Sequence, residues 1–305
     1  MAWVQPPTLQ SDMKKKLAAA LLLLATSSAV FAKPKQPKAP AAAISKESSE
    51  NQVLRFLEAP HAATLNDRLV AASELFAGRV YALDPLGEGA GTLDPDPLYR
   101  FDVFDCQTFV ETVLALQKAK DFSDFLLRFA AMRYDSGKTL YEYRSHLVEA
   151  QWMPRNIASG VFTDITAEIG AGNEKKALFE VSDKGLAKGY EPFLERLQSL
   201  WPIGSYSINY LPLDWALANI EKIPTNTIIQ VVRLPKVGVP HTVTHQGIYL
   251  EKDGKRFLRN ASSSPRFQKV VDRDLKGYLE FNQTYFSKAG RWPVVGINIL
   301  QINDL

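Results

Sequence analysis

The spacing of apolar residues changes near Thr227, and this change constrains the fold more than any other feature of the chain. Before Thr227, segments such as 106–116 and 122–133 repeat apolar residues at the helical period of about 3.6. After it, alternating runs rich in β-branched residues predict strands at 228–234, 239–250, 257–262 and 294–302. Helices first and antiparallel strands later predict an α+β fold.

The segments between these elements are shorter and more irregular. Further helices are predicted after Thr64, which is a favourable N-cap, over 191–200 and from Asp274 to Phe281. Gly and Pro punctuate Asp84 to Pro97, which predicts a loop. No strand directly precedes its glycines and no helix follows at once, so a phosphate-binding loop is disfavoured. We expect a mobile loop at the border of a cleft.

The start of the chain carries an export pattern. Lysines follow Met13, and the apolar run from Leu17 to Ala29 is short for a membrane span. Val30-Phe31-Ala32 fits a cleavage site. We therefore expect translation to start at Met13, a signal peptide over residues 1–32, a periplasmic protein and no stable membrane insertion after cleavage.

Residues 33–49 are rich in Pro, Ala and Lys and predict a flexible linker. Residues 50–305 then suit a single domain with an insertion around 120–200. The formal net charge of +3 comes largely from lysines in the signal peptide and the linker. No basic field remains that would favour nucleic acid as a partner.

Cys106 is the only cysteine of the chain. Exported proteins use cysteine mostly in disulfide pairs, and a single residue cannot form one within its own chain. It is therefore inert in the core, bonded to a second chain, or retained because it reacts. Asp105 is a favourable N-cap, so the sulfur is expected at the start of an apolar helix, where the backbone dipole favours the thiolate.

A two-residue hairpin loop is predicted at 253–254, where the sequence is Asp-Gly. The resulting register pairs His245 with Ser262, and it pairs Asn260 with Gly247 on the face of His245. Diagonal neighbours in a sheet are roughly 7–8 Å apart, within reach of an imidazole–amide hydrogen bond. Such a bond would hold the proton of one ring nitrogen and direct the other nitrogen outward.

The other histidines do not indicate a metal site. His241 and His245 would share a strand face but lie roughly 13 Å apart at about 3.3 Å per residue. We expect His61, His146 and His241 to be structural or surface residues. Without a cluster of ligands at metal-binding spacing, neither a metal nor a cofactor is predicted.

These motifs resemble the NlpC/P60 superfamily of papain-like cell-wall hydrolases, and more narrowly the DUF1460 family. The resemblance rests on Asp105-Cys106-Gln-Thr-Phe-Val-Glu111, on Tyr143-Arg144-Ser-His146 with Trp152 and Asn156, and on His245-Gln-Gly247 with Asn260-Ala-Ser262. It covers most of residues 50–305. Two positions depart from the family pattern, since Asn260 stands where His is frequent and Gln107 where Ser or Thr is commoner.

The resemblance implies a papain-like α+β core in which an N-terminal helix carrying Cys106 packs on the C-terminal antiparallel sheet. It also implies a single catalytic domain over 50–305 with a helical insertion around 120–200. Its activity would be that of a periplasmic cysteine amidase that cleaves the N-acetylmuramoyl-L-alanine bond of peptidoglycan fragments through a thioester. Cys106 would attack, His245 would accept its proton and Asn260 would orient His245.

With the resemblance, Arg144, His146 and Trp152 become candidates for binding the substrate, although residue type alone favours a structural or surface role for His146, and the loop at 87–91 could open for the sugar. Two alternatives stay open. The same three catalytic residues could cut the bond between γ-D-glutamate and the diamino acid, or the domain could be a non-catalytic peptidoglycan-binding module. A binding module has no need of Cys106, His245 and Asn260 together, which disfavours the second alternative.

Overall fold

The computed structural model describes residues 48–182 and 201–304. The signal peptide predicted over 1–32, the linker up to residue 47 and the helix predicted over 191–200 lie outside these residues. The last two residues of the predicted linker belong to the folded part, because Ser48 caps helix α2 (Ser49–Glu58). None of the helices described is long and apolar enough to span a bilayer.

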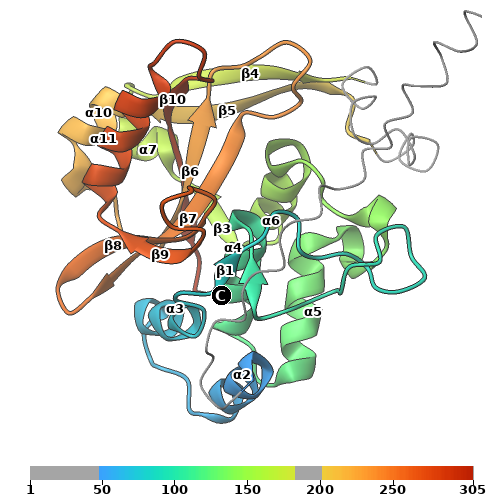
Figure 1. Ribbon diagram of the computed structural model, residues 1–305. Coiled ribbons are helices and arrows are strands. Elements are labelled where there is room, and N and C mark those ends of the chain that lie inside the picture. The colour runs from blue at the N-terminus through green and yellow to red at the C-terminus, as the bar shows by residue number, and fades with distance from the viewer. Residues whose placement is uncertain (1–47, 183–200, 305) are drawn as a thin grey trace, which may run out of the picture. The chain divides into compact units, whose positions relative to one another are not determined.

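Ten strands among the described residues form one sheet, which Figure 1 shows as a curled layer. In chain order they are β1 (Val80–Tyr81), β2 (Val103–Phe104), β3 (Phe162–Asp164), β4 (Lys175–Val181), β5 (Gly204–Pro212), β6 (Thr227–Arg233), β7 (Val243–Lys252), β8 (Lys255–Ser262), β9 (Lys269–Arg273) and β10 (Val294–Ile302). Their order across the sheet is β2-β1-β9-β8-β7-β6-β10-β5-β4, and β3 pairs with β10. Only β1 and β2 pair in parallel.

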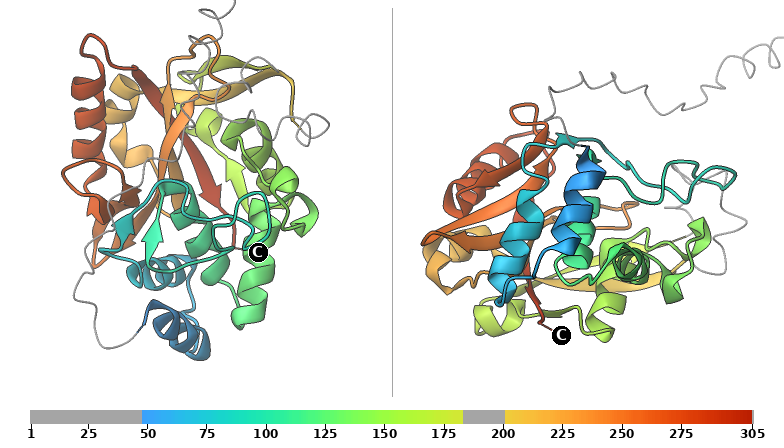
Figure 2. Two further views of the ribbon diagram at one scale, coloured as in Figure 1. Left: turned by 45° about the vertical axis from the view of Figure 1, so that its right-hand side comes forward. Right: turned by 90° about the horizontal axis from the view of Figure 1, so that it is seen from below.

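Helices cover both faces of the sheet (Figure 2). On one side lie α3 (Leu65–Glu74), α4 (Cys106–Leu116) and α5 (Phe122–Arg133), and on the other α10 (Leu213–Ala218) and α11 (Leu275–Phe286). The connection from α5 to β4 holds α6 (Met153–Ala158), α7 (Thr166–Gly170) and the short turns η1 (Asp135–Gly137), η2 (Tyr141–Tyr143) and η3 (Val148–Trp152); η5 (Ile220–Lys222) follows α10.

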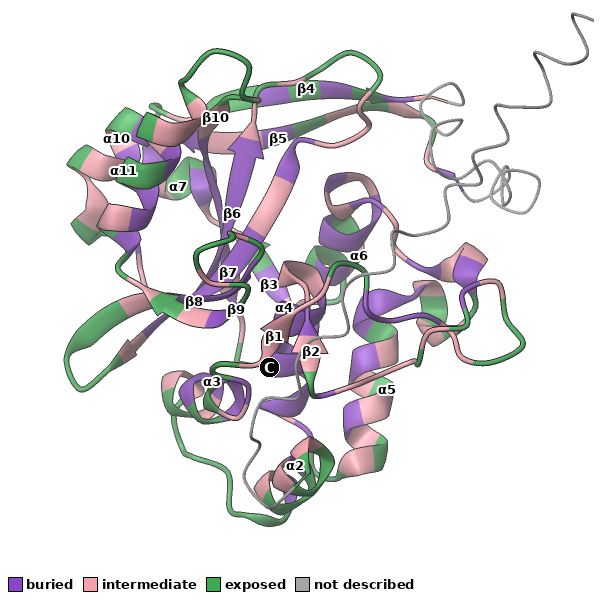
Figure 3. Ribbon diagram, in the orientation of Figure 1, coloured by how far each residue is buried: buried purple, intermediate pink, exposed green. Residues whose placement is uncertain are grey.

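The central strands are buried on both faces, and their side chains alternate between two cores. In β6, Ile228 and Val232 join the core beneath α4, whereas Ile229 and Val231 join the core beneath α11. Figure 3 shows this burial along β6 and β7. Because β6 is covered on both faces, its residues form a nearly continuous apolar run.

The hairpin prediction is confirmed. Lys252 pairs with Lys255, and Ile248 pairs with Arg259, in the predicted register. Asp253 and Gly254 take positive φ values of 52° and 70°, as a type I′ turn requires. The helices predicted at 106–116 and 122–133 are confirmed as well, and Thr64 caps α3 as predicted.

The observed strands differ from the predicted ones in two respects. The strand predicted from 239 begins only at Val243, because the N–H groups of Thr242 and Val243 donate to the buried carboxylate of Glu149 rather than to a strand. Strands β1, β3, β4, β5 and β9 were not predicted. The side chains of β4 alternate between exposed and buried, so its period of two could have revealed it.

Candidate active site

Strands that are distant in the sequence end at one rim of the sheet. Tyr81 and Phe104 are the last residues of β1 and β2 and pair with each other, and Cys106 follows two residues later. Ser262, the last residue of β8, pairs with Lys269 of β9, which also pairs with β1. Strand β7 begins at the same rim because it forms a hairpin with β8. The topology therefore brings the rim residues of five strands and the start of α4 together.

The start of α4 is held by a capping box. The N–H of Thr108 donates to Oδ1 of Asp105 (2.7 Å), and the N–H of Asp105 donates to Oγ1 of Thr108 (3.0 Å). The other carboxylate oxygen of Asp105 accepts from the N–H of Asp84 (3.1 Å). As the first residue of α4, Cys106 has an N–H that no earlier helical carbonyl can accept.

The imidazole of His245 is bound to Asn260. Its Nε2 lies 3.1 Å from Oδ1 of Asn260, so Nδ1 is the nitrogen left to accept a proton. A β-bulge at Thr244 precedes His245 in the pairing of β7 with β6, and such bulges redirect neighbouring side chains. Gly247 is required beside the pair, because a Cβ there would lie 2.8 Å from the Cβ of Asn260. The imidazole–amide contact that the hairpin register predicted is therefore present.

Cys106 is a free, partly exposed cysteine. Its sulfur accepts from the N–H of Gln246, the residue after His245, and from the first N–H groups of α4. Burial and the neighbouring Asp105 outweigh these donors and raise the pKa of the thiol to about 12. Burial also lowers the pKa of His245 to about 4. At neutral pH both groups are uncharged, contrary to the expected preference for the thiolate.

A chain of side-chain hydrogen bonds ties α4 to β7. Nε2 of Gln246 donates to Gln107 (2.6 Å), whose Nε2 donates to Glu111 (2.9 Å). Glu111 is paired with Arg133 of α5 (2.9 Å), and Gln246 accepts from Gln230 of β6 (2.9 Å). This glutamine chain joins the residues that follow the thiol and the imidazole, so it holds Cys106 at the strand that carries His245.

Tyr81 lies at the same rim as the thiol. Its side chain is hydrogen-bonded to the side chain of Ser263. Burial, together with the charges of Cys106 and Asp105, raises the pKa of the Tyr81 hydroxyl well above its usual value. The phenol therefore stays protonated and can donate a hydrogen bond beside the sulfur.

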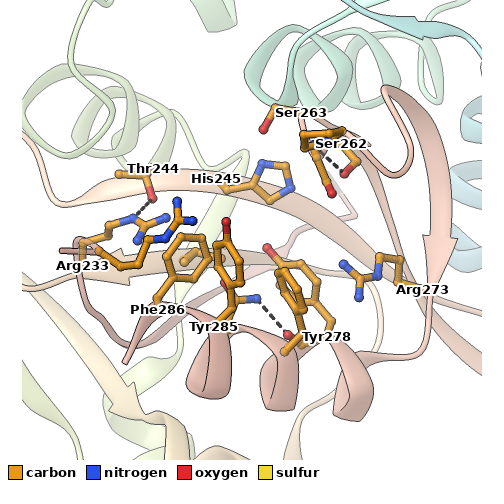
Figure 4. A pocket seen from close by; sticks show the side chains of 15 residues that line it. Arg233, Thr244, His245, Ser262, Ser263, Arg273, Tyr278, Tyr285 and Phe286 are labelled. Carbon is orange, nitrogen blue, oxygen red and sulfur yellow. Dashed lines mark hydrogen bonds between the residues drawn. The ribbon is translucent and has the colours of Figure 1, made fainter. Parts of the chain in front are cut away.

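A cavity of about 500 Å³ opens beside His245, between the sheet and α11 (Figure 4). Its size is that of a small-molecule site. Ser262 and Ser263 border it on the rim side, and the rings of Tyr278 and Tyr285 rise from α11 toward the strand of His245. Cys106 does not line this cavity, so the cavity extends from the imidazole on the side of the sheet that faces α11.

Three arginines line the cavity, namely Arg233, Arg273 and Arg291, and we refer to them as the cavity arginines. No Asp or Glu lines it. Within residues 48–182 and 201–304, no carboxylate forms an ion pair with any of the three. Burial lowers the pKa of Arg233 and of Arg273, and the nearby Tyr278 offsets their desolvation only in part.

Arg144 does not line the cavity. Its side chain is buried, and its guanidinium lies 3.0 Å from Glu88, 2.9 Å from Asp94 and 3.1 Å from the carbonyl of Leu86. This pairing corrects the expectation that Arg144 binds a substrate carboxylate, because its donors are already used inside the protein. It also fixes the loop at 84–97, so we no longer expect the segment 87–91 to open for a sugar.

The expectations for Trp152 and His146 are corrected in the same way. Trp152 is fully buried and packs on Phe162. The ring of His146 is bonded to the carbonyl of Tyr141 (2.8 Å), and its pKa is lowered to about 3 by burial and by Arg144. These side chains support the insertion and do not border the cavity.

Sequence reasoning missed Tyr81, the cavity arginines and helix α11 as a wall of the site. One signal was present, since the predicted register paired His245 with Ser262, which borders the cavity. Nothing in the sequence pattern pointed to the arginines, because they come from β6, β9 and the segment before β10. No group of His, Cys, Asp and Glu in the described part of the chain is arranged to hold a metal ion.

Comparisons with known proteins agree on the family. The family model described as "AmiA-like: N-acetylmuramoyl-L-alanine amidase-like" matches residues 71–285. The crystal structure of a Legionella pneumophila protein of the DUF1460 family is similar over 83% of this chain and 93% of its own, with a TM-score of 0.70 and 25% identity. No curated protein matches the chain.

A structure of an N-acetylmuramoyl-L-alanine amidase from Bacteroides uniformis shares the fold. It is similar over 77% of this chain and 99% of its own, with a TM-score of 0.57 and 22% identity. The resemblance to DUF1460 is thereby confirmed, and the family model covers well over half of the chain. The chain belongs to the N-acetylmuramoyl-L-alanine amidase-like (AmiA-like) family.

Proposed function

We propose that this protein is a cysteine amidase with a papain-like NlpC/P60 core, which cleaves the amide between N-acetylmuramic acid and L-alanine in peptidoglycan fragments. The observation that carries the proposal is that Cys106 lies against β7, the strand whose His245 is bound to Asn260. The thiol lies at the start of α4 against the main chain of β7, and Asn260 holds Nε2 of His245 at 3.1 Å.

The reaction begins from a neutral thiol and a neutral imidazole. Nδ1 of His245 removes the proton as Sγ attacks the carbonyl carbon, which gives a tetrahedral oxyanion and an imidazolium. The N–H of Cys106 and the hydroxyl of Tyr81 are the donors beside the sulfur that can stabilise this oxyanion. The imidazolium then protonates the alanine nitrogen, and the carbon–nitrogen bond breaks.

A thioester between Cys106 and the lactyl group remains. His245 removes a proton from water as the oxygen attacks the thioester carbon, the carbon–sulfur bond breaks, and the imidazolium returns its proton to the leaving sulfur, which restores the neutral thiol and imidazole. The products are a sugar with a free lactyl carboxylate and a peptide with a free N-terminal alanine. Asn260 keeps the Nε2 proton in place through both steps, which preserves the orientation of the ring. The proposal agrees with the export pattern predicted over residues 1–32, because peptidoglycan lies outside the cytoplasm.

The test is mass analysis of muramyl-peptide fragments after incubation with the purified protein. We expect a peptide that begins with alanine and a sugar that has lost it. Cys106→Ala should remove turnover while leaving the free energy of unfolding nearly unchanged, and Asn260→Ala should lower kcat by about ten- to a thousandfold. A product sugar that still carries Ala-Glu would assign the protein to the γ-D-glutamyl endopeptidases instead. Binding of fragments without any cleavage would favour a binding module.

A further inference from the structure

We propose that the cavity between His245 and α11 is a subsite for a carboxylate of the substrate, and that it takes the acidic peptide part of a wall fragment. The identity of the peptide rests on the proposed function. The binding of a carboxylate rests on the cavity itself.

The charge of the cavity is the first observation. Arg233, Arg273 and Arg291 line it without an acidic residue, and no carboxylate among the described residues pairs with them. Arg233 and Arg273 are half-buried and face the cavity without a carboxylate, which is costly unless a ligand supplies the counter-charge, and the exposed Arg291 adds a third positive charge. The cavity therefore favours an anion.

The stacking of the guanidinium groups is the second observation. The guanidinium carbon of Arg273 lies 5.0 Å from the ring centre of Tyr278, and that of Arg291 lies 4.5 Å from the ring centre of Tyr285. Neither side chain donates a hydrogen bond to another described residue. The rings support the guanidinium faces and leave the N–H edges available, which is the arrangement that binds a planar carboxylate through two bonds.

Arg233 is positioned differently and closes one end of the cavity. Its Nε donates to Oγ1 of Thr244 (2.8 Å), another of its nitrogens donates to the carbonyl of Trp292, and its guanidinium stacks 4.0 Å above Phe286. These contacts fix the group in place and use part of its donors. We therefore assign the main carboxylate contact to Arg273 and Arg291, with Arg233 contributing its charge.

The shape of the cavity favours a peptide carboxylate over a small inorganic anion. A volume of about 500 Å³ exceeds the needs of a single phosphate. Phe281 and Phe286 provide apolar walls that suit the methylene groups of a glutamyl or diamino acid side chain. In the proposed reaction we assign this cavity to the peptide side of the scissile amide, because the peptide carries the free carboxylates whereas the lactyl group is held in the amide.

The same arginines connect binding to the proton transfer. Arg273 and Arg233 add to burial in lowering the pKa of His245, whereas Asn260 and Asp105 oppose them. The Tyr278 ring of α11 also faces His245 at 6.3 Å. A bound carboxylate would offset the arginine charges, so the imidazolium that forms during attack on the amide would cost less.

The experiment uses Cys106→Ala protein, which binds without turnover, and measures affinity by titration calorimetry. The probes are the dipeptide L-Ala-γ-D-Glu, the same dipeptide with both carboxylates amidated, and inorganic phosphate. We expect the free dipeptide to bind at least tenfold more tightly than the other two. In this background, Arg273→Gln should weaken the dipeptide by about ten- to a hundredfold, and Arg273→Lys should do so by less.

Arg266→Gln is the matched control. Arg266 and Arg273 both stack on Phe267, at 5.4 and 5.2 Å, but only Arg273 lines the cavity. Equal binding of the dipeptide and its diamide, or equal effects of the two substitutions, would overturn the proposal. Tighter binding of phosphate than of the dipeptide would overturn the peptide assignment. Because these are binding measurements, a carboxylate site can be established even if the wild-type protein cleaves no wall fragment.

Discussion

Arg144 and Arg273 carry the same guanidinium group in opposite surroundings. Arg144 is buried among Glu88, Asp94 and a carbonyl, so its charge is balanced inside the protein. Arg273 stacks on aromatic rings beside a cavity and has no acidic partner in the described part of the chain. The difference shows that the arginine of the sequence motif has its charge balanced inside the protein, whereas the arginine without a carboxylate partner lines the cavity.

The largest expected effect is on stability and concerns Arg144, whose charge is balanced by buried carboxylates. Arg144→Leu leaves two carboxylates without their cation in a buried position, which should lower the free energy of unfolding by about 3–5 kcal/mol. Urea denaturation measures it. Arg273→Leu is the matched variant and should change stability by about 1 kcal/mol or less, because it breaks no ion pair and loses only contacts with aromatic rings. Equal stability losses in the two variants would remove the distinction between the two groups.

The next effect concerns the glutamine chain, which links the buried pair of Glu111 and Arg133 to the site. Gln107→Leu leaves Gln246 without its acceptor and frees α4 from β7, so kcat should fall by about tenfold or more while KM changes little. Gln246→Leu should act on the same contact, so the effects of the two substitutions should not add in the double variant.

The matched control for that prediction is Gln117→Leu. Gln117 lies at the end of the same helix and bonds to Arg68 (3.2 Å), away from the thiol. Its loss should affect stability and leave kcat unchanged. A fall in kcat for Gln117→Leu equal to that of Gln107→Leu would assign the effect to the helix as a whole rather than to the bridge.

Burial suppresses the protonation of His146 and of His245, with Arg144 adding to it at His146 and Arg273 at His245, and this makes stability depend on pH. The folded-state pKa values are about 3 for His146 and about 4 for His245, compared with about 6.5 in an unfolded chain. The unfolded chain therefore binds more protons between about pH 6.5 and 4. Stability should be fully present above pH 6.5 and fall on acidification, by about 1.4 kcal/mol per pH unit for each histidine.

His146→Gln should flatten this dependence by removing one of the two contributions. Denaturation midpoints between pH 7 and 4.5 measure the slope, which is independent of any constant loss of stability in the variant. An unchanged slope would mean that His146 is not held neutral by burial and by Arg144.

The smallest expected effect concerns Arg273, the arginine without a carboxylate partner, and is measured in the pH dependence of activity. Arg273→Gln removes a positive charge beside His245, so the pKa of the free-enzyme imidazole should rise from its low value. The acid limb of the kcat/KM profile should move to higher pH by up to about one unit. Arg266→Gln should leave the acid limb in place. A shift of the acid limb to lower pH in Arg273→Gln would contradict the conclusion that the charge of Arg273 lowers the pKa of His245.

Local rules in the sequence account for the parts of the site that are close together in the chain. The Asp105 cap of α4 depends on residues three positions apart, and the hairpin turn at 253–254 sets the contact between His245 and Asn260. Capping and hairpin pairing involve near neighbours, so their geometry follows from residue type and spacing. The sequence by itself therefore determined the helix that carries the thiol, the imidazole–amide pair and the family.

Only the tertiary structure decided which charges meet. The partners of Arg144 come from a loop about fifty positions earlier, and the walls of the cavity come from four strands and α11. The pKa of the thiol was likewise decided by packing, because burial beside Asp105 outweighed the helix terminus. Electrostatic partners and desolvation depend on distances through space, which spacing along the chain does not encode. For that reason the motif indicated Arg144, whereas the fold directs the available charge of Arg273 toward the site.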